Sequence, residues 1–185
     1  MVHSNKGITL IALVITIIVI IILASISVNY GMDLIYKSRT ENFITNMLVI
    51  KSKARIYEEE VESKIWDFSD NVEEEANISK KEEGRRDHLK NDYHFILVNN
   101  ENSSEYNMSD LQNDSVYYAL EETALDKMGL SSLWENKKSC YVVKYEVKDN
   151  KYEDIDIYYT KGIQYKGNIY YKLSELQNVI MSIST

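Results

Sequence analysis

The feature that most constrains this chain is an uncharged apolar run near its N-terminus, Ile8–Val28. Its only polar side chains are Thr9, Thr16, Ser25 and Ser27. At about 1.5 Å per residue, a helix over this run is about 31 Å long, which matches the hydrocarbon thickness of a bilayer. Each Ile, Leu or Val adds about −0.3 to −0.6 kcal/mol in favour of insertion. The run therefore predicts a single membrane-spanning helix.

The groups that precede the run predict its orientation. Lys6, His3 and the initiator amine flank its start, and the positive-inside rule places that end in the cytoplasm. We expect a single-pass protein of the cell membrane whose remaining residues lie outside the cell or in the cell wall. Two other interpretations stay open here. One is a plain signal-anchor. The other is a secretory signal cleaved near Ser25 or Ser27, although the run exceeds the roughly 7–15 apolar residues typical of such signals.

The residues at the start of the run, Lys6–Ile11 (KGITLI), resemble the processing motif of type IV prepilins. In that family a prepilin peptidase cuts after an obligatory glycine, and the next residue becomes the N-methylated terminus. The resemblance implies a leader peptide over residues 1–7, cleavage between Gly7 and Ile8, and methylation of Ile8. Glycine suits this bond because a backbone without Cβ can approach a membrane-embedded aspartyl protease closely.

The fifth residue after the expected cut departs from the family pattern. Type IV pilins usually carry glutamate there, which neutralises the terminal amine of a neighbouring subunit in the filament core, whereas this chain has Ala12. An unpaired glutamate in hydrocarbon costs about 2–3 kcal/mol, and alanine removes both this cost and the pairing. The resemblance then implies a minor or tip pilin, or a Gram-positive, clostridial-like branch of the family. Thr9 and Thr16 would join Ala12 in the filament core, with hydroxyls that by default bond their own helix backbone.

Residues 8–28 are expected to continue outward into an amphipathic stem helix over residues 29–66. Ile44, Met47, Leu48, Val61 and Ile65 recur at intervals of three and four, which indicates one buried stripe. The opposite face carries the charged side chains Lys51, Lys53, Arg55, Glu58, Glu59 and Glu60. We interpret these as a solvated helix face, since a calcium loop needs alternating oxygen ligands and a glycine.

Residues 67–115 are predicted to form a charged and variable connection. Asp67–Asp92 has few large apolar side chains and many charges, which favours an exposed, partly helical segment. Residues 99–115 are rich in Asn, Ser, Asp and Glu and predict a polar surface loop. His88 and His94 lack matching ligands at the usual spacing, so no metal site is expected.

Residues 116–185 are predicted to form a C-terminal α+β head that begins and ends with helical patterns. Apolar residues recur with helical spacing over Tyr117–Met128, and Ser115 and Gly129 suit the two ends of a short helix. A capping-box pattern at Ser174 opens a last helix.

Between these helices the period changes to two, which indicates strands. Apolar and polar residues alternate around Tyr141–Val147 and Asp154–Tyr159, and Asp149 and Asn150 suit the turn of an antiparallel hairpin. Ile169–Leu173 suits a third short strand. The expected fold class is α+β and pilin-like: a long N-terminal helix, with a membrane half and an amphipathic half, packed on a small antiparallel sheet.

Several function classes are disfavoured by composition. The net charge of −8 disfavours nucleic-acid binding through a broad basic face. Cys140 is the only cysteine, and its place in an apolar run favours a buried structural thiol over a nucleophile. No Ser/His/Asp, Cys/His or glycine-rich phosphate-binding pattern occurs, so neither an enzyme nor a cofactor is expected. Tyrosines crowd Tyr141–Tyr171; we expect most to cap a core, with an adhesive or glycan-stacking surface as the alternative.

The resemblance implies a type IV pilin-like subunit that forms a surface filament or pseudopilus. Its expected partners are the prepilin peptidase, other pilin subunits, an assembly platform protein, a motor ATPase and the membrane. The alternative is a signal-anchored extracellular binding or sensory domain that does not polymerise. Such a domain would keep its leader and stay in the membrane.

Overall fold

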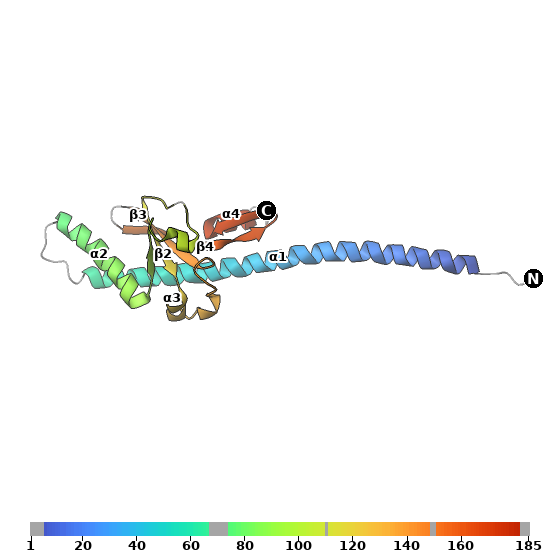
Figure 1. The fold of residues 1–185 in the computed structure, drawn as a ribbon, viewed down its shortest axis with the longest axis horizontal. Coiled ribbons are helices and arrows are strands. Elements are labelled where there is room, and N and C mark those ends of the chain that lie inside the picture. The colour runs from blue at the N-terminus through green and yellow to red at the C-terminus, as the bar shows by residue number, and fades with distance from the viewer. Residues whose placement is uncertain (1–5, 67–73, 110, 149–150, 182–185) are drawn as a thin grey trace, which may run out of the picture. The chain divides into compact units, whose positions relative to one another are not determined.

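The computed structural model describes residues 6–66, 74–109, 111–148 and 151–181; within these ranges the side chains of residues 6–11, 26–31, 33, 66 and 74–80 are not described. The chain divides into an N-terminal unit, Met1–Glu41, and a globular unit, Asn42–Thr185. The long helix α1 contributes to both (Figure 1). The helices and strands are α1 (Lys6–Trp66), α2 (Glu74–Tyr93), β1 (Ile96–Val98), β2 (Ser115–Leu120), α3 (Glu122–Lys127), β3 (Tyr141–Lys148), β4 (Lys151–Tyr165), β5 (Asn168–Lys172) and α4 (Leu173–Met181).

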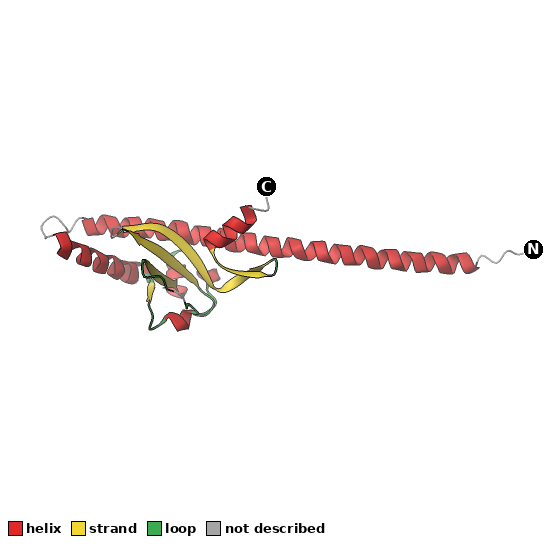
Figure 2. Cartoon of the chain, turned by 90° about the horizontal axis from the view of Figure 1, so that it is seen from above, coloured by secondary structure: helices red, strands yellow, loops and turns green. Residues whose placement is uncertain are grey.

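The globular unit is built on one five-stranded sheet whose strand order, β1-β2-β3-β4-β5, follows the chain. Every neighbouring pair is antiparallel, so the sheet is a meander (Figure 2). Helices and an antiparallel sheet together confirm the α+β class. A meander needs only short connections, which suits a chain of this length.

The predicted hairpin of β3 and β4 is confirmed. Tyr141 pairs with Tyr159 and Val143 with Ile157, so the apolar residues of both strands lie on the same face. Strand β4 is longer than predicted and runs on to Tyr165, with a register shift where it pairs with β5. The predicted turn at residues 149–150 lies outside the described residues.

The predicted helix over Tyr117–Met128 is wrong in its first half. Ser115–Leu120 forms β2, and only Glu122–Lys127 is helical. Both faces of β2 are buried, so its apolar residues show no alternation. Their spacing therefore resembled that of a helix. Gly129 follows the helix with φ +70°, as expected for its predicted terminal role.

One face of the sheet is covered by α1, whose buried stripe was predicted. Met47, Ile50, Ala54 and Val61 are completely buried, and they pack with β-sheet residues including Val143. A further link crosses the interface: the Tyr145 hydroxyl donates a hydrogen bond of 3.1 Å to the carbonyl of Ala54. Leu48 and Ile56, by contrast, remain 40% and 49% exposed. The buried stripe is thus narrower than the spacing suggested.

The charged segment predicted as a connection forms a full helix, α2, that is tied to α1. Arg85 is buried and forms an ion pair with Glu62, and its guanidinium lies 4.5 Å from the ring centroid of Tyr152. The Tyr93 hydroxyl donates to Glu60, so a carboxylate of the predicted solvated face has a partner. Strand β1 also comes from within residues 67–115.

The opposite face of the sheet carries a second, smaller core. Val98, Tyr106, Tyr117, Ala119, Cys140 and Val142 are buried there. Cys140 is 0% exposed, which confirms the expected buried thiol. Tyr106 anchors the 3-10 turn Ser103–Tyr106 of the predicted polar loop, and its hydroxyl donates to Glu121 over 2.7 Å.

The end of the chain differs slightly from its predicted form. Strand β5 begins one residue earlier than expected, at Asn168, and α4 begins at Leu173. Ser174 does not act as the cap of α4. Its hydroxyl and its backbone N–H both donate to Asp156 of β4, at 2.6 and 3.3 Å. These bonds attach α4 to the sheet.

Candidate functional site

The residues expected at the processing site all lie in α1. Gly7 and Ile8 fall in its first turn, because the helix begins at Lys6. Thr9 follows in the same turn, and for these three only the backbone is described. Ala12 and Thr16 lie on the next two turns and are exposed. The sequence motif therefore lies within the first described turns of α1.

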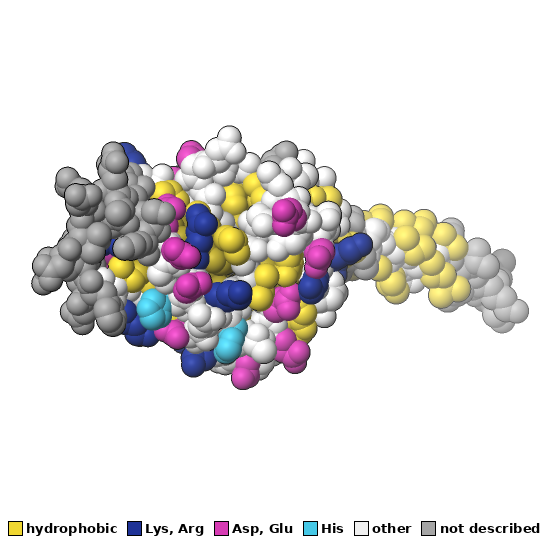
Figure 3. Space-filling view, turned by 60° about the vertical axis from the view of Figure 1, so that its left-hand side comes forward, with side chains coloured by type: hydrophobic (Ala, Val, Ile, Leu, Met, Phe, Trp, Pro, Cys, Tyr) yellow, Lys and Arg dark blue, Asp and Glu magenta, His cyan; other side chains and the backbone are white. Residues whose placement is uncertain are grey.

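The N-terminal unit exposes an apolar surface over Leu13–Leu23. Ten large apolar side chains in this stretch are between 47% and 63% exposed: Leu13, Val14, Ile15, Ile17, Ile18, Val19, Ile20, Ile21, Ile22 and Leu23. They occupy almost every position over three helical turns, so every side of the helix is apolar. Figure 3 shows one of these sides. A helix that is apolar on all sides is normally covered, either by protein or by lipid.

The polar side chains Thr16, within this stretch, and Ser25, just after it, bond to their own helix. The Thr16 hydroxyl donates to the carbonyl of Leu13 over 2.8 Å, and Ser25 donates to the carbonyl of Ile21. These bonds satisfy the hydroxyls within the helix, as expected for Thr16. Among the residues whose side chains are described, no helix has an apolar stretch long enough to cross a bilayer.

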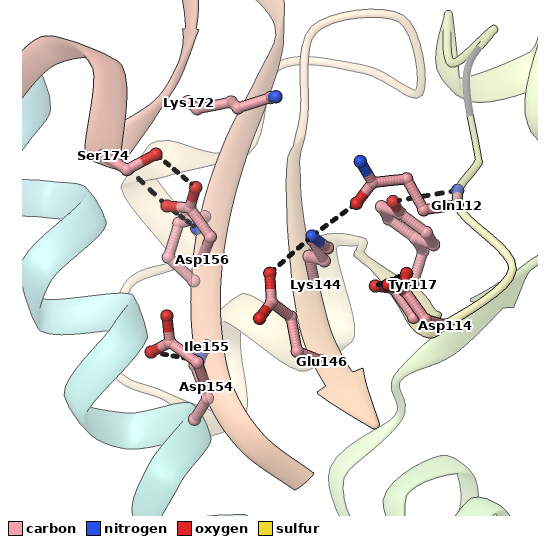
Figure 4. A network of polar contacts seen from close by, with 12 residues as sticks. Gln112, Asp114, Tyr117, Lys144, Glu146, Asp154, Ile155, Asp156, Lys172 and Ser174 are labelled. Carbon is pink, nitrogen blue, oxygen red and sulfur yellow. Dashed lines mark hydrogen bonds and ion pairs between the residues drawn. The ribbon is translucent and has the colours of Figure 1, made fainter. Parts of the chain in front are cut away.

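The outer face of the sheet, away from α1, carries a polar network around Lys144. This lysine is only 7% exposed, and its Nζ donates to Gln112 over 2.6 Å and to Glu146 over 2.9 Å (Figure 4). Burial disfavours its charge, but the hydrogen bond and the charge of Glu146 outweigh burial and raise the pKa of Lys144. Lys144 therefore stays a cation and holds Gln112 in place. The alternation of β3 placed this lysine on the polar face but did not predict its burial.

The residues with catalytic or metal-binding chemistry do not converge in the described structure. Burial raises the pKa of the Cys140 thiol to about 11, so the nucleophilic thiolate is scarce at neutral pH. His88 Nδ1 lies 3.0 Å from Asp92 on the same helix, and His94 lies beyond the end of that helix. No cluster of three His, Cys, Asp or Glu side chains suited to a metal occurs in the described parts of the chain.

Most tyrosines between Tyr141 and Tyr171 belong to the cores. Tyr141, Tyr145, Tyr159 and Tyr165 are all at most 5% exposed. Burial is the main cause that raises the pKa of Tyr145 and of Tyr159. Tyr171, which is 44% exposed, is an exception.

Among the cavities in the described part of the globular unit, two are formed between strands of the sheet and neighbouring segments. A cavity of about 430 Å³ lies on the outer face of the sheet, between the segment after the 3-10 turn, β4, β5 and α4. A cavity of about 580 Å³ lies between α2 and strands β1 and β2, with charged residues of both signs on its helix side. Neither cavity was predicted, because each is formed by segments that are far apart in the sequence.

Comparisons with known proteins return no match: no family model, no curated protein and no solved structure resembles the chain closely enough to count. The inference of function therefore rests on this chain's own residues. Two features carry it, the processing motif with its exposed apolar helix, and the outer face of the sheet.

Proposed function

We propose that the chain is a type IV pilin-like subunit that a prepilin peptidase cleaves between Gly7 and Ile8 and that then enters a surface filament or pseudopilus. The observation that carries the proposal is the apolar surface of Leu13–Leu23, which is exposed on every side of α1. The same helix, within the globular unit, presents a single buried stripe to an antiparallel sheet. Together with the KGITLI motif, this is the combination that a filament subunit needs.

The energetics of this surface support an assembly. Full burial of one Ile, Leu or Val side chain contributes about 1.5–3 kcal/mol, so covering the half-exposed residues of this stretch contributes roughly 10 kcal/mol. In the proposed scheme, lipid covers the surface before assembly, and helices of neighbouring subunits cover it in the filament. Association inside lipid depends on close packing and not on the hydrophobic effect. Removal of the helix from lipid by an assembly platform and a motor ATPase would then commit it to its neighbours.

Ala12 bears on which kind of pilin subunit we propose. A methyl side chain cannot pair with the terminal amine of a neighbour, so the proposed subunit relies on apolar packing alone at that level of the core. A minor or tip pilin, or a divergent lineage, fits this property. Cleavage does not depend on it, since the proposed recognition lies at Gly7.

The test is the identity of the mature N-terminus. Full-length chain is coexpressed with an active or an inactivated prepilin peptidase, and the product is examined by N-terminal sequencing and intact mass. We expect a product that begins with a monomethylated Ile8 only when the peptidase is active, and no cleavage of Gly7→Val. Gly31→Val is the matched control, because it changes another glycine of α1, and it should be cleaved normally. An intact leader on the unmodified chain in the presence of active peptidase would refute the proposal.

The alternative, an anchored extracellular domain that does not polymerise, is favoured by one observation, the missing glutamate at Ala12. Mechanical shearing of the producing cells separates the two functions. A filament subunit appears in the sheared fraction beside other pilins, whereas an anchored domain remains with the cells. An uncut leader together with retention in the cell fraction would support the alternative.

A further inference from the structure

We propose that the cavity on the outer face of the sheet is a binding site for a neutral saccharide. It has a volume of about 430 Å³, within the range of pockets that hold small organic ligands. Residues from four segments line it, among them Asn107, Gln112, Tyr158, Tyr171 and Glu175. The proposal concerns the globular unit alone and does not depend on filament formation.

Aromatic residues supply the apolar part of the site. The ring of Tyr158 packs edge-on against Tyr117, with centroids 6.0 Å apart, and so has a fixed position. The ring of Tyr171 lies over Gly162, where an added Cβ would be only 2.9 Å from its Cε1 atom. The missing Cβ of Gly162 thus lets this ring sit against the backbone while 44% of Tyr171 stays exposed. Tyrosine combines a flat apolar face with a polar end, which suits the C–H face and the hydroxyls of a sugar ring.

Uncharged amides and hydroxyls supply the polar part. Asn107 is in the left-handed conformation, with φ 54°, and its Nδ2 donates to the carbonyl of Thr160 over 3.0 Å. Gln112 uses its Oε1 to accept from Lys144, so its Nε2 is directed away from that lysine (Figure 4). Ser109 is exposed at the same cavity. Groups of this kind both donate and accept, as sugar hydroxyls require.

The walls are held in place before a ligand arrives. Thr160 donates from its hydroxyl to the carbonyl of Lys138 over 3.0 Å and accepts from the backbone N–H of Cys140 over 3.1 Å. Lys144 in turn holds Gln112, as described above. A preformed site loses less entropy on binding than a mobile one, which favours measurable affinity for a small ligand.

Charge selects a neutral ligand over an ionic one. The two charged residues of the lining, Lys172 and Glu175, form an ion pair of 3.6 Å with each other. Lys172 Nζ also lies 5.5 Å from the ring centroid of Tyr158. The lining therefore has no net charge, while the whole chain carries −8 and repels anions. An acidic saccharide should bind more weakly than its neutral counterpart.

The larger cavity beside α2 is less suited to an extended peptide than its position suggests. It lies next to β1, an edge strand that could in principle pair with another strand. The carbonyl of Leu97 in this strand, however, already accepts from Asn102 Nδ2 over 2.9 Å. This bond protects the edge, so the smaller cavity is the better candidate.

The experiment uses the full chain purified in a polyoxyethylene detergent, because detergents with sugar headgroups would compete. The probes are maltotriose, cellotriose, chitotriose, mannotriose and N-acetyllactosamine, with sialyllactose as the anionic probe and a capped Ala-Asn-Ser tripeptide as the peptide probe. Saturation-transfer NMR detects binding, and calorimetry measures Kd. We expect at least one neutral saccharide to bind, and sialyllactose and the tripeptide to bind more weakly or not at all.

Matched variants locate the site. Tyr171→Ala and Gln112→Ala should each weaken binding about tenfold, since each removes one side of the contact. Tyr36→Ala changes a tyrosine of similar exposure, 41%, in the N-terminal unit, and Asn113→Ala removes the exposed amide next to Gln112; both should bind as the unmodified chain does. Resistance of Cys140 to alkylation confirms folding of each variant. The proposal is overturned if no neutral saccharide binds, if only the tripeptide binds, or if the two site variants bind normally.

Discussion

Two stretches of α1 differ in how their apolar side chains are covered. Along Leu13–Leu23, α1 is apolar on every side, and its large apolar side chains are about half exposed. Along the stretch from Met47 to Val61, it is apolar on one stripe, and Met47, Ile50 and Ala54 in that stripe are 0% exposed. The apolar stripe of the second stretch is buried against the sheet of its own chain. The first has a surface that a partner, lipid or protein, has to cover.

The difference teaches that hydrophobicity alone does not stabilise a domain; its distribution around the helix does. A stripe that recurs every three or four residues can be buried against one sheet while charged residues remain in solvent. A helix with no polar side cannot be buried in this way by a small domain. It follows that substitutions in the two stretches should have opposite consequences for folding and for assembly.

The sharpest test of this comparison places one charge in each stretch. Ile50→Asp puts a carboxylate without a partner into the core and should lower the free energy of unfolding by about 5 kcal/mol, which is close to the whole stability of many domains. Ile18→Asp changes a residue that is 51% exposed, so it should alter that free energy by less than about 0.5 kcal/mol. Urea unfolding of the full chain in detergent, followed by tryptophan fluorescence, measures both.

The comparison also predicts opposite effects in cells. Ile18→Asp should reduce recovery of the protein in sheared filaments while its globular unit stays folded. Equal loss of stability in the two variants would contradict the division of α1 into a self-covered and a partner-covered stretch.

A second test uses Cys140 as a reporter of the globular unit. Because burial raises the pKa of its thiol to about 11, from about 8.5 in an unfolded chain, the thiolate is roughly a hundredfold scarcer at pH 8. Iodoacetamide should therefore label the folded chain at least about a hundredfold more slowly than the chain in urea, as measured by intact mass. Ile18→Asp should keep this protection and Ile50→Asp should lose it.

The same pKa shift predicts the pH dependence of stability. The folded state favours the protonated thiol of Cys140. The stabilisation that this preference adds to the free energy of unfolding is therefore complete below the pKa of the thiol in the unfolded chain, near 8.5, and is lost as the pH rises towards 11. Rapid labelling of the folded chain at pH 8 would contradict the burial of this thiol.

The smallest expected effect is a difference in stability between alanine substitutions at two glycines of the globular unit. Both glycines have positive φ, but their surroundings differ. At Gly162, with φ +75°, a new Cβ would collide with Ile169 Cγ2, whereas Gly167, with φ +83°, has no atom within 4 Å of such a Cβ. Gly162→Ala should cost about 2 kcal/mol, from strain and displacement of neighbours, and Gly167→Ala about 1 kcal/mol, from strain alone. Thermal unfolding of both variants measures the difference, and equal costs would show that the contacts of Gly162 contribute nothing.

Much of the globular unit could be predicted because its signals are local. The alternation of Tyr141–Val147 identified β3, and the spacing of Met47 and Val61 identified the buried face of α1. Prediction failed at β2, where Tyr117, Tyr118, Ala119 and Leu120 are all buried and no alternation remains. A strand covered on both faces has lost the period of two that distinguishes it from a helix.

The candidate sites divide in the same way. The motif at Gly7 and the apolar run can be recognised without any structure, because they depend on residues adjacent in the chain. The cavity near Tyr171 could not be predicted, since it requires the segment around Asn107 to lie beside β4 and β5. The burial of Arg85 and Lys144 was equally invisible, because their partners Glu62 and Gln112 come from distant segments and reach them only after folding.

The sequence by itself determined that this chain has an apolar helical segment in need of cover on every side, with a glycine at its boundary. Composition and period suffice for that, because they are properties of consecutive residues. Only the tertiary structure decided which charged residues are buried in pairs, which strand is covered on both faces, and where a cavity lies. Those outcomes depend on contacts between distant segments, whose free energies no local pattern records.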